Sequence, residues 1–206
     1  MPALLRKSKL WIFVVCLIPL ARLVVLGFTD GLGANPIEFI TRSTGTWTLV
    51  GLMVTLSVTP LRRLTGRAEL IRFRRMLGLF TFFYVCLHFT TYIWLDQFFD
   101  PAAIVKDIIK RPFITVGFAA FILLIPLAAT STHAMIRRLG RRWQQLHRLV
   151  YVIAILGVVH YLWLIKKDIT EPVVYGGILT LLLFLRLPWG LALLQTARAR
   201  LIPARA

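Results

Sequence analysis

Acidic residues and cysteines are scarce in this sequence, and each shortage excludes a class of protein. The chain of 206 residues has two cysteines, Cys16 and Cys86, both inside apolar runs, and it has no C-x-x-C motif. We therefore expect neither a structural disulfide nor a cysteine-based metal or redox site. Aspartate and glutamate number 8 against 25 lysines and arginines, which gives a formal net charge of +17. In a soluble protein this charge would indicate nucleic-acid binding.

Polar stretches long enough to fold into a soluble domain are also missing. Hydrophobic residues make up 58% of the chain and recur in long runs. A run of about 20 apolar residues crosses a hydrocarbon core of about 30 Å as a helix. The sequence therefore predicts one integral membrane domain over residues 1–206. Because the basic residues lie in short loops between the apolar runs, we expect membrane lipid and no nucleic acid around it.

Hydropathy predicts an all-α fold, a bundle of six transmembrane helices. No A-x-A cleavage site follows the first apolar run, so we interpret this run as a retained span. Residues 30–45, DGLGANPIEFITRSTG, contain turn residues and are expected to form the first outer loop. No internal repeat is evident beyond the rhythm of apolar runs. The predicted spans are residues 10–28, 46–61, 76–95, 113–130, 149–165 and 173–187.

Charge alternates between the predicted loops. Basic residues gather before the first span, in the second and fourth loops and after the sixth span. All acidic residues except Glu69 lie in the other loops. Because lysine and arginine stay on the cytoplasmic side of a membrane, we expect both termini of the chain in the cytoplasm.

Two histidines lie at matching depths in predicted spans. His88 is about 12 residues into the third span and His160 about 11 residues into the fifth, so both lie about 18 Å from the cytoplasmic ends. A histidine inside hydrocarbon is costly unless its ring is bound to something, although either one alone would fit a packing role. Two imidazoles at one depth are suited to holding a haem as axial ligands, and such a haem passes single electrons.

His147 has no such counterpart. It lies about 20 Å from His160 along an ideal helix and roughly 140° around it. The level in the third span where a second histidine would be needed holds Arg74 and Arg75. A second haem with two histidine ligands is therefore not predicted. Three interpretations of His147 remain: a ligand of a second cofactor with an unusual partner, a residue of a quinone or flavin site, or a cap of the helix start.

Several arginines lie where a charge needs an explanation. Arg22 is within the first span at about the depth of His88, and a charge there is costly unless paired. A haem propionate would be one partner, and extension of the side chain to the outer surface is the simpler interpretation. Arg72, Arg74 and Arg75 could hold a flavin phosphate or a quinone headgroup, but the cytoplasmic excess of positive charge explains them as well.

Five short motifs are spread along the chain between residues 31 and 161. They are GLGANP in the first outer loop, RRMLGL opening the third span, LHFTTY around His88, RPFITVG opening the fourth span, and WQQLHRLVY with the later pair His160-Tyr161. In combination they resemble the MsrQ family, also called YedZ. That family belongs to the ferric reductase-like transmembrane group, alongside the NADPH oxidases.

The resemblance implies a function and a set of partners. It implies the haem-binding subunit of a periplasmic methionine sulfoxide reductase system in the bacterial inner membrane, with b-type haem and a bound FMN. Electrons would come from quinol of the respiratory quinone pool and pass to the periplasmic molybdenum-containing catalytic subunit, MsrP. The family's three key histidines fall on His88, His147 and His160. Because no nucleotide-binding domain follows the last span, NAD(P)H would be oxidised by another protein, such as a cytoplasmic flavin reductase.

The sequence thus predicts a membrane b-type cytochrome with one haem between His88 and His160, and a second only if His147 finds a partner. As an electron-transfer subunit it would leave the removal of oxygen from methionine sulfoxide to its partner. Two alternatives stay open. One is a stand-alone transmembrane ferric or quinone reductase, and the other is a non-redox carrier whose histidines bind a transported metal.

Overall fold

The described part of the chain is helical throughout. The computed structural model describes residues 3–201, and no strand occurs among them. This confirms the predicted all-α class. The helices are α1 (Ala3–Phe28), α2 (Pro36–Thr65), η1 (Ala68–Leu70), α3 (Ile71–Thr91), η2 (Tyr92–Asp96), α4 (Pro101–Lys110), α5 (Pro112–Ala129), α6 (His133–Leu139), α7 (Arg141–His147), α8 (Leu149–Leu164), α9 (Thr170–Phe184) and α10 (Pro188–Leu201).

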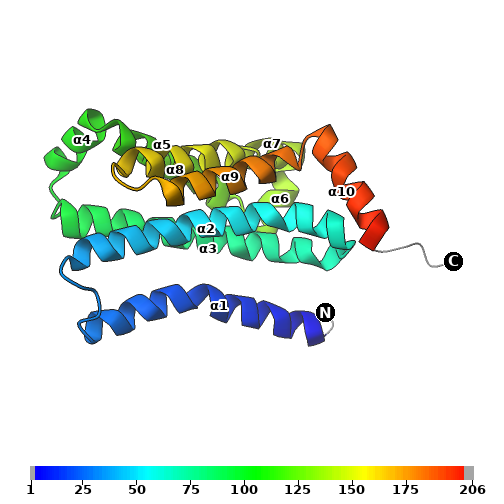
Figure 1. The fold of residues 1–206 in the computed structure, drawn as a ribbon, viewed down its shortest axis with the longest axis horizontal. Helices are drawn as coiled ribbons and strands as arrows, with labels where there is room; N and C mark the ends of the chain where they lie inside the picture. Colours follow the sequence, from blue (N-terminus) through cyan, green and yellow to red (C-terminus); the bar gives the residue numbers. More distant parts are fainter. Residues whose placement is uncertain (1–2, 202–206) are drawn as a thin grey trace.

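Five of the described helical segments are long and apolar enough to cross a membrane. A sixth span results if α9 and α10 are counted together, but these two helices meet at an angle of 84°. The bend lies before Pro188, which begins α10. The cytoplasmic location of both chain ends stays a prediction, and the ends themselves lie outside the described residues. The starts of α1 and α10 lie at the same end of the bundle (Figure 1).

The segment predicted as the first outer loop is largely helical, which corrects the sequence-based boundary. α2 begins at Pro36, ten residues before the predicted span. The Asn35 side chain caps this start by accepting a hydrogen bond from the Glu38 backbone N–H at 3.2 Å. Asparagine is favoured at the cap because its side chain accepts a hydrogen bond from a free backbone N–H. Proline is favoured at the first helical position because it has no N–H that would be left unpaired there. Hydropathy did not predict these ten residues as part of the span because Glu38 and Arg42 are charged.

Two antiparallel helix pairs form the centre of the bundle. α2 packs along α3, and α5 packs along α8 (Figure 1). Leu56, Ile153 and Ala154 are almost completely buried where α2 and α8 meet, and they belong to one apolar cluster that also includes α5 and α9 residues. The sequence treats His147 and His160 as residues of one ideal helix, but the structure has a break at Arg148 that separates α7 from α8.

α1 lies beside this centre and contacts mainly α3 (Figure 1). The helical hydrogen-bond pattern of α1 is interrupted at Pro19, which has no N–H to donate. The Tyr84 hydroxyl bridges two backbone groups of α1 at this point: it donates to the Cys16 carbonyl at 2.7 Å and accepts from the Leu20 N–H at 3.3 Å. One side chain of α3 thus replaces a helical hydrogen bond of α1 and holds the two helices together.

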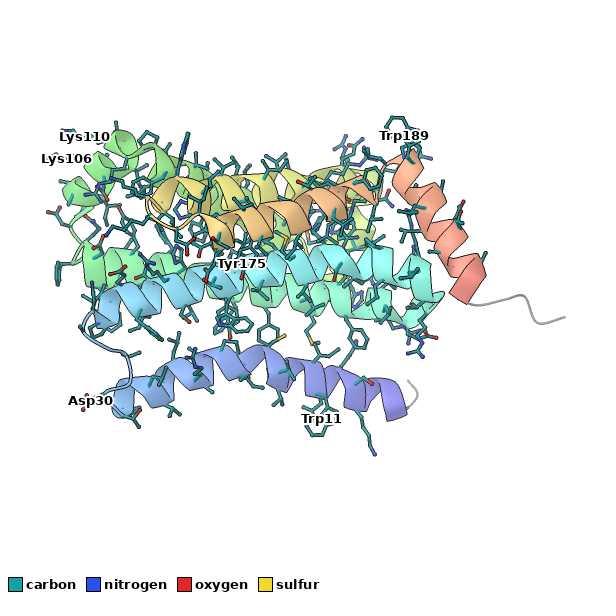
Figure 2. All side chains as sticks on the ribbon, viewed as in Figure 1. Trp11, Asp30, Lys106, Lys110, Tyr175 and Trp189 are labelled. Carbon is teal, nitrogen blue, oxygen red and sulfur yellow. The ribbon has the colours of Figure 1, made fainter. Side chains whose placement is uncertain are left out.

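The two ends of the bundle differ in composition. The arginine-rich end consists of residues 62–75 and 137–148, with the short helices α6 and α7. The opposite end holds α4 and the loops before α2 and α9. Lys106 and Lys110 of α4 lie at this opposite end, far from Trp189 of α10 (Figure 2). Val105 and Ile109 of α4 are exposed, as expected for a helix that lies in a membrane interface.

Candidate functional site

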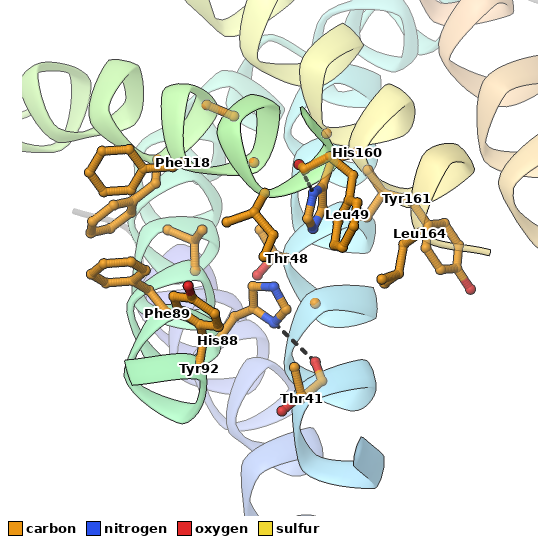
Figure 3. A pocket seen from close by; sticks show the side chains of 18 of the residues that line it. Thr41, Thr48, Leu49, His88, Phe89, Tyr92, Phe118, His160, Tyr161 and Leu164 are labelled. Atoms are coloured by element: carbon orange, nitrogen blue, oxygen red, sulfur yellow. Dashed lines mark hydrogen bonds between the residues drawn. The ribbon is translucent and has the colours of Figure 1, made fainter. Parts of the chain in front are cut away.

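A cavity of about 310 Å³ lies between α2, α3, α5 and α8, toward the opposite end of the bundle. His88 of α3 and His160 of α8 both line it (Figure 3). The structure therefore brings together the two histidines that the sequence places at one depth. Both histidines are partly buried, and the space that they face is enclosed by four helices.

His88 is oriented by α2. Its ring nitrogen Nδ1 lies 3.0 Å from the Thr41 carbonyl oxygen (Figure 3). A carbonyl can only accept, so Nδ1 carries the proton and Nε2 keeps its lone pair. The ring lies directly over Gly45, one turn further along α2. The early start of α2 therefore matters for the site, because both contacts come from residues predicted to be loop.

His160 is oriented in the same way by α5. Its Nδ1 lies 2.7 Å from the Phe113 carbonyl oxygen, and its ring covers Gly117. Phe113 is in the first turn of α5, and its carbonyl oxygen has a second lone pair that can accept from a side chain besides the helical N–H. Here too the proton is on Nδ1 and the lone pair on Nε2. A metal-binding histidine typically shows this pattern, because the hydrogen bond at one nitrogen fixes the tautomer and strengthens the other nitrogen as a ligand.

The two imidazoles lie close together without bonding to each other. Their ring centres are 6.2 Å apart, and their planes meet at 76°. A bond from a metal to an imidazole nitrogen is about 2 Å long. The ring centre lies about 1.1 Å behind that nitrogen, given ring bonds of about 1.3–1.4 Å. Two imidazoles on opposite sides of one iron therefore have ring centres about 6 Å apart, which is the separation observed here.

Apolar side chains form the walls of the cavity. Phe89 of α3 stacks on Phe121 of α5 with ring centres 4.7 Å apart, and it also contacts Phe118 at 5.8 Å. Leucines and isoleucines of α2, α5 and α8, together with Val85 of α3, complete the lining. A large flat apolar molecule would find contacts on both faces, since aromatic and branched side chains pack well against such a surface.

Polar groups gather where the cavity approaches the opposite end of the bundle. Arg42 pairs with Glu38 at 2.7 Å, and Arg111 pairs with Asp107 at 2.8 Å. Asp107 also accepts from the Tyr92 hydroxyl at 3.2 Å. Arg42 and Arg111 line the cavity, and sequence reasoning missed both. The sequence offered one indication: both are basic residues of the predicted outer loops, where the acidic residues gather.

His147 lies at the arginine-rich end, away from this cavity, and its surroundings are different. Its Nε2 is 3.0 Å from the Thr130 hydroxyl, which itself donates to the Pro126 carbonyl at 2.7 Å. The hydroxyl must then accept, so Nε2 of His147 carries the proton. Trp143 stacks on the ring with centres 3.9 Å apart, and its indole N–H donates to the Thr130 carbonyl at 3.0 Å.

The arginines singled out from the sequence are spread over the molecule. Arg22 is exposed, does not line the cavity and lies 6.0 Å from the centre of the Phe39 ring. Arg74 is partly buried and acts electrostatically on His147 and Arg186, whereas Arg72 and Arg75 are exposed. In residues 3–201, no three histidine, cysteine or acidic side chains gather to hold a metal ion.

Comparison with known proteins agrees with this architecture. Residues 39–158 match the family model described as ferric reductase like transmembrane component. A protein of Herminiimonas arsenicoxydans is 58% identical over 192 residues, which are 92% of this chain and 88% of that protein. A protein of Ralstonia nicotianae is 61% identical over 191 residues, which are 91% of this chain and 88% of that protein. Both are named protein-methionine-sulfoxide reductase heme-binding subunit MsrQ.

This chain belongs to the MsrQ family. A third relative of the same name, from Rhodospirillum rubrum, is 54% identical over 183 residues, 88% of each chain. The resemblance stated from the motifs is thereby confirmed. None of the solved structures matches the chain. The matched segment of the family model begins in the first turns of α2 and ends within α8, so it contains His88 and Gly45 but stops two residues before His160.

Proposed function

We propose that this chain is a b-type cytochrome of the bacterial inner membrane that passes electrons to a methionine sulfoxide reductase on the periplasmic side. The observation that carries the proposal is the pair His88 and His160, whose ring centres are 6.2 Å apart across an apolar cavity. The relatives' name supports it, because they are called heme-binding subunits of a methionine-sulfoxide reductase.

The residues of the cavity fit a haem. His88 and His160 would be the axial ligands, because each presents a neutral Nε2 while its Nδ1 donates to a backbone carbonyl. Arg42 and Arg111 stand at the polar rim of an otherwise apolar cavity, where they would pair with propionates through charge-assisted hydrogen bonds. Haem supplies one-electron chemistry at its iron, and two histidine ligands leave no open position for oxygen or substrate.

The polypeptide contributes orientation and insulation. The Thr41 and Phe113 carbonyls hold the two rings in one tautomer, and the phenylalanines of α3 and α5 keep water from the cavity. The arginine-rich end would face the cytoplasm by the positive-inside rule. The cavity therefore lies nearer the periplasmic surface, where the molybdenum-containing subunit MsrP would accept electrons beside α4 and the loop before α9.

The electron source lies at the arginine-rich end in this proposal. Quinol, or a cytoplasmic flavin reductase, would deliver electrons there, near His147 and Arg74. FMN, which the family resemblance implies, would find cationic partners for its phosphate among Arg72, Arg74 and Arg75. A second haem would need His147 as a ligand through Nδ1, since its Nε2 is engaged by Thr130.

A visible spectrum of the purified membrane protein tests the central claim. We expect about one haem per chain bound between His88 and His160, with a reducible b-type Soret band and a low-spin ferric state. A colourless preparation from haem-replete cells would contradict the proposal and would favour a metal carrier. In the presence of the periplasmic subunit, quinol should be oxidised continuously only when methionine sulfoxide is supplied as the electron acceptor.

The family model gives one observation in favour of a second function, a stand-alone ferric reductase. The same membrane protein would then reduce ferric chelates without any periplasmic partner. Steady-state reduction of a ferric chelate, with and without the molybdenum-containing subunit, separates the two functions. Co-purification with that subunit and negligible chelate reduction would support the relay.

A further inference from the structure

The surroundings of the two cavity histidines have the same construction, although they come from different helix pairs. In each pair the imidazole lies across one turn of the neighbouring helix. It donates to the carbonyl at the start of that turn, from Thr41 or Phe113, and it covers a glycine one turn further on. The carbonyl and its histidine are separated by 47 residues in both pairs.

A side chain at either glycine would press against the histidine ring. A Cβ at Gly45 would lie 3.1 Å from Cε1 and 3.2 Å from Nδ1 of His88. A Cβ at Gly117 would lie 2.7 Å from Nδ1 and 2.8 Å from Cε1 of His160. Both glycines are inside helices, where glycine is less favourable than alanine. Because glycine has no side chain, the ring can approach the helix this closely, at the cost of some helix propensity.

We infer that Gly45 and Gly117 are positioning residues that set the orientation of the two axial histidines. This inference rests on the haem proposed above. Each glycine lets its ring lie flat against a helix, within reach of one carbonyl, so the two helices fix the angle of 76° between the imidazole planes. A methyl group at either position would push the ring away from its carbonyl and rotate it.

The orientation has two measurable consequences for the iron. The hydrogen bond from Nδ1 raises the basicity of Nε2, which stabilises the ferric state and lowers the midpoint potential. The angle between the imidazole planes sets the anisotropy of the low-spin ferric signal in electron paramagnetic resonance, and nearly perpendicular planes give a large maximal g value. Displacing one ring should therefore raise the potential and change the g value while haem stays bound.

The test compares three glycine-to-alanine variants of the full-length protein. Gly117→Ala and Gly45→Ala address the two histidines. Gly78→Ala is the matched control, because it lies on the same helix as His88 and its new Cβ would meet only Thr55 Cγ2, at 3.9 Å. Haem content, the resonance spectrum and a redox titration are measured for each protein.

We expect graded results. Gly78→Ala should match the wild type, Gly45→Ala should shift the g value and raise the potential modestly, and Gly117→Ala should do so more strongly because its contacts are shorter. If Gly117→Ala takes up no haem, Gly45→Ala decides: a shifted signal supports the inference and an unchanged one overturns it.

Failure of the inference differs from failure of the proposed function. A wild-type protein with bound haem and two variants that keep its g value and potential would overturn the inference alone. A wild-type protein without a b-type spectrum would overturn both. A control variant that shifts as much as Gly45→Ala would show that any added methyl group disturbs the iron, and would also overturn it.

Discussion

His88 and His160 differ from His147 in which ring nitrogen is left free, and that difference separates two levels of the molecule. At the cavity the two Nδ1 atoms donate to carbonyls, and no hydrogen bond from the described residues reaches either Nε2. At the arginine-rich end Nε2 of His147 is engaged by Thr130, and Trp143 covers the ring. The position of a histidine in the sequence therefore does not by itself make it a ligand. The hydrogen bonds around its ring decide which nitrogen, if any, is available to bind a metal.

The two levels also differ in what balances their charge. The arginines at the cavity rim have carboxylate partners, Glu38 and Asp107. At the arginine-rich end Arg74 lies near Arg186, which donates to the Leu56 carbonyl at 2.6 Å and to the Tyr151 hydroxyl at 3.3 Å. The rim arginines are thus paired with anionic side chains, whereas Arg186 at the other level is held by neutral oxygens.

The largest effect is expected from the cavity histidines. His88→Ala or His160→Ala should abolish the low-spin haem signal, because each change would remove one of the two proposed iron ligands. The pyridine haemochrome content and the Soret band measure the loss. His133→Ala, at an exposed histidine of α6, is the matched control and should leave the spectrum unchanged. Full haem with an unaltered low-spin spectrum in either cavity variant would refute the assignment.

His147→Ala should have a smaller effect on haem and a clear effect on its reduction. The cavity keeps both of its ligands, so most of the low-spin signal should remain. Reduction by quinol or by a flavin reductase should slow, because the proposed function has electrons entering at this level. Stopped-flow absorbance with each donor measures the rate. An apo-protein after this change would mean that the cavity pair is not the main haem site.

The rim arginines should contribute affinity without being required for binding. In Arg42→Gln and Arg111→Gln, a hydrogen bond to a charged group worth about 1.5–3 kcal/mol is weakened, so haem affinity should fall about tenfold in each. Haem transfer to apomyoglobin measures this. Arg22→Gln should show wild-type affinity, because Arg22 lies outside the cavity. A larger loss in Arg22→Gln than in the rim variants would favour the propionate role considered from the sequence.

The smallest effect is expected at the junction with α1. Tyr84→Phe removes the hydroxyl that bridges Cys16 and Leu20, and it should lower the stability by about 1 kcal/mol, or the Tm by about 2–4 °C for a chain of this size. The haem spectrum should not change, because α1 is outside the cavity. Thermal unfolding followed by tryptophan fluorescence gives the Tm, and a spectral shift at the iron would contradict the separation of α1 from the site.

Much of the site could be predicted from the sequence, and the remainder has a physical reason. Depth follows from counting residues along a span, so the sequence alone pairs His88 with His160. Arg42 and Arg111 were missed because hydropathy assigns charged residues to loops and says nothing about which loop approaches a cavity. The start of α2 was missed for the same reason, although the cap at Asn35 and Pro36 was readable.

The sequence by itself determined that the chain is helical, apolar enough for a membrane and built around histidines at one level, because hydropathy and residue counting are local properties. Only the tertiary structure decided which helix faces each imidazole, and hence that the Thr41 and Phe113 carbonyls set the tautomers and that Gly45 and Gly117 lie under the rings. It also decided that Nε2 of His147 is hydrogen-bonded to the Thr130 hydroxyl. These contacts depend on how far each helix is rotated against its neighbour, and that rotation follows from packing across the whole bundle rather than from any one segment.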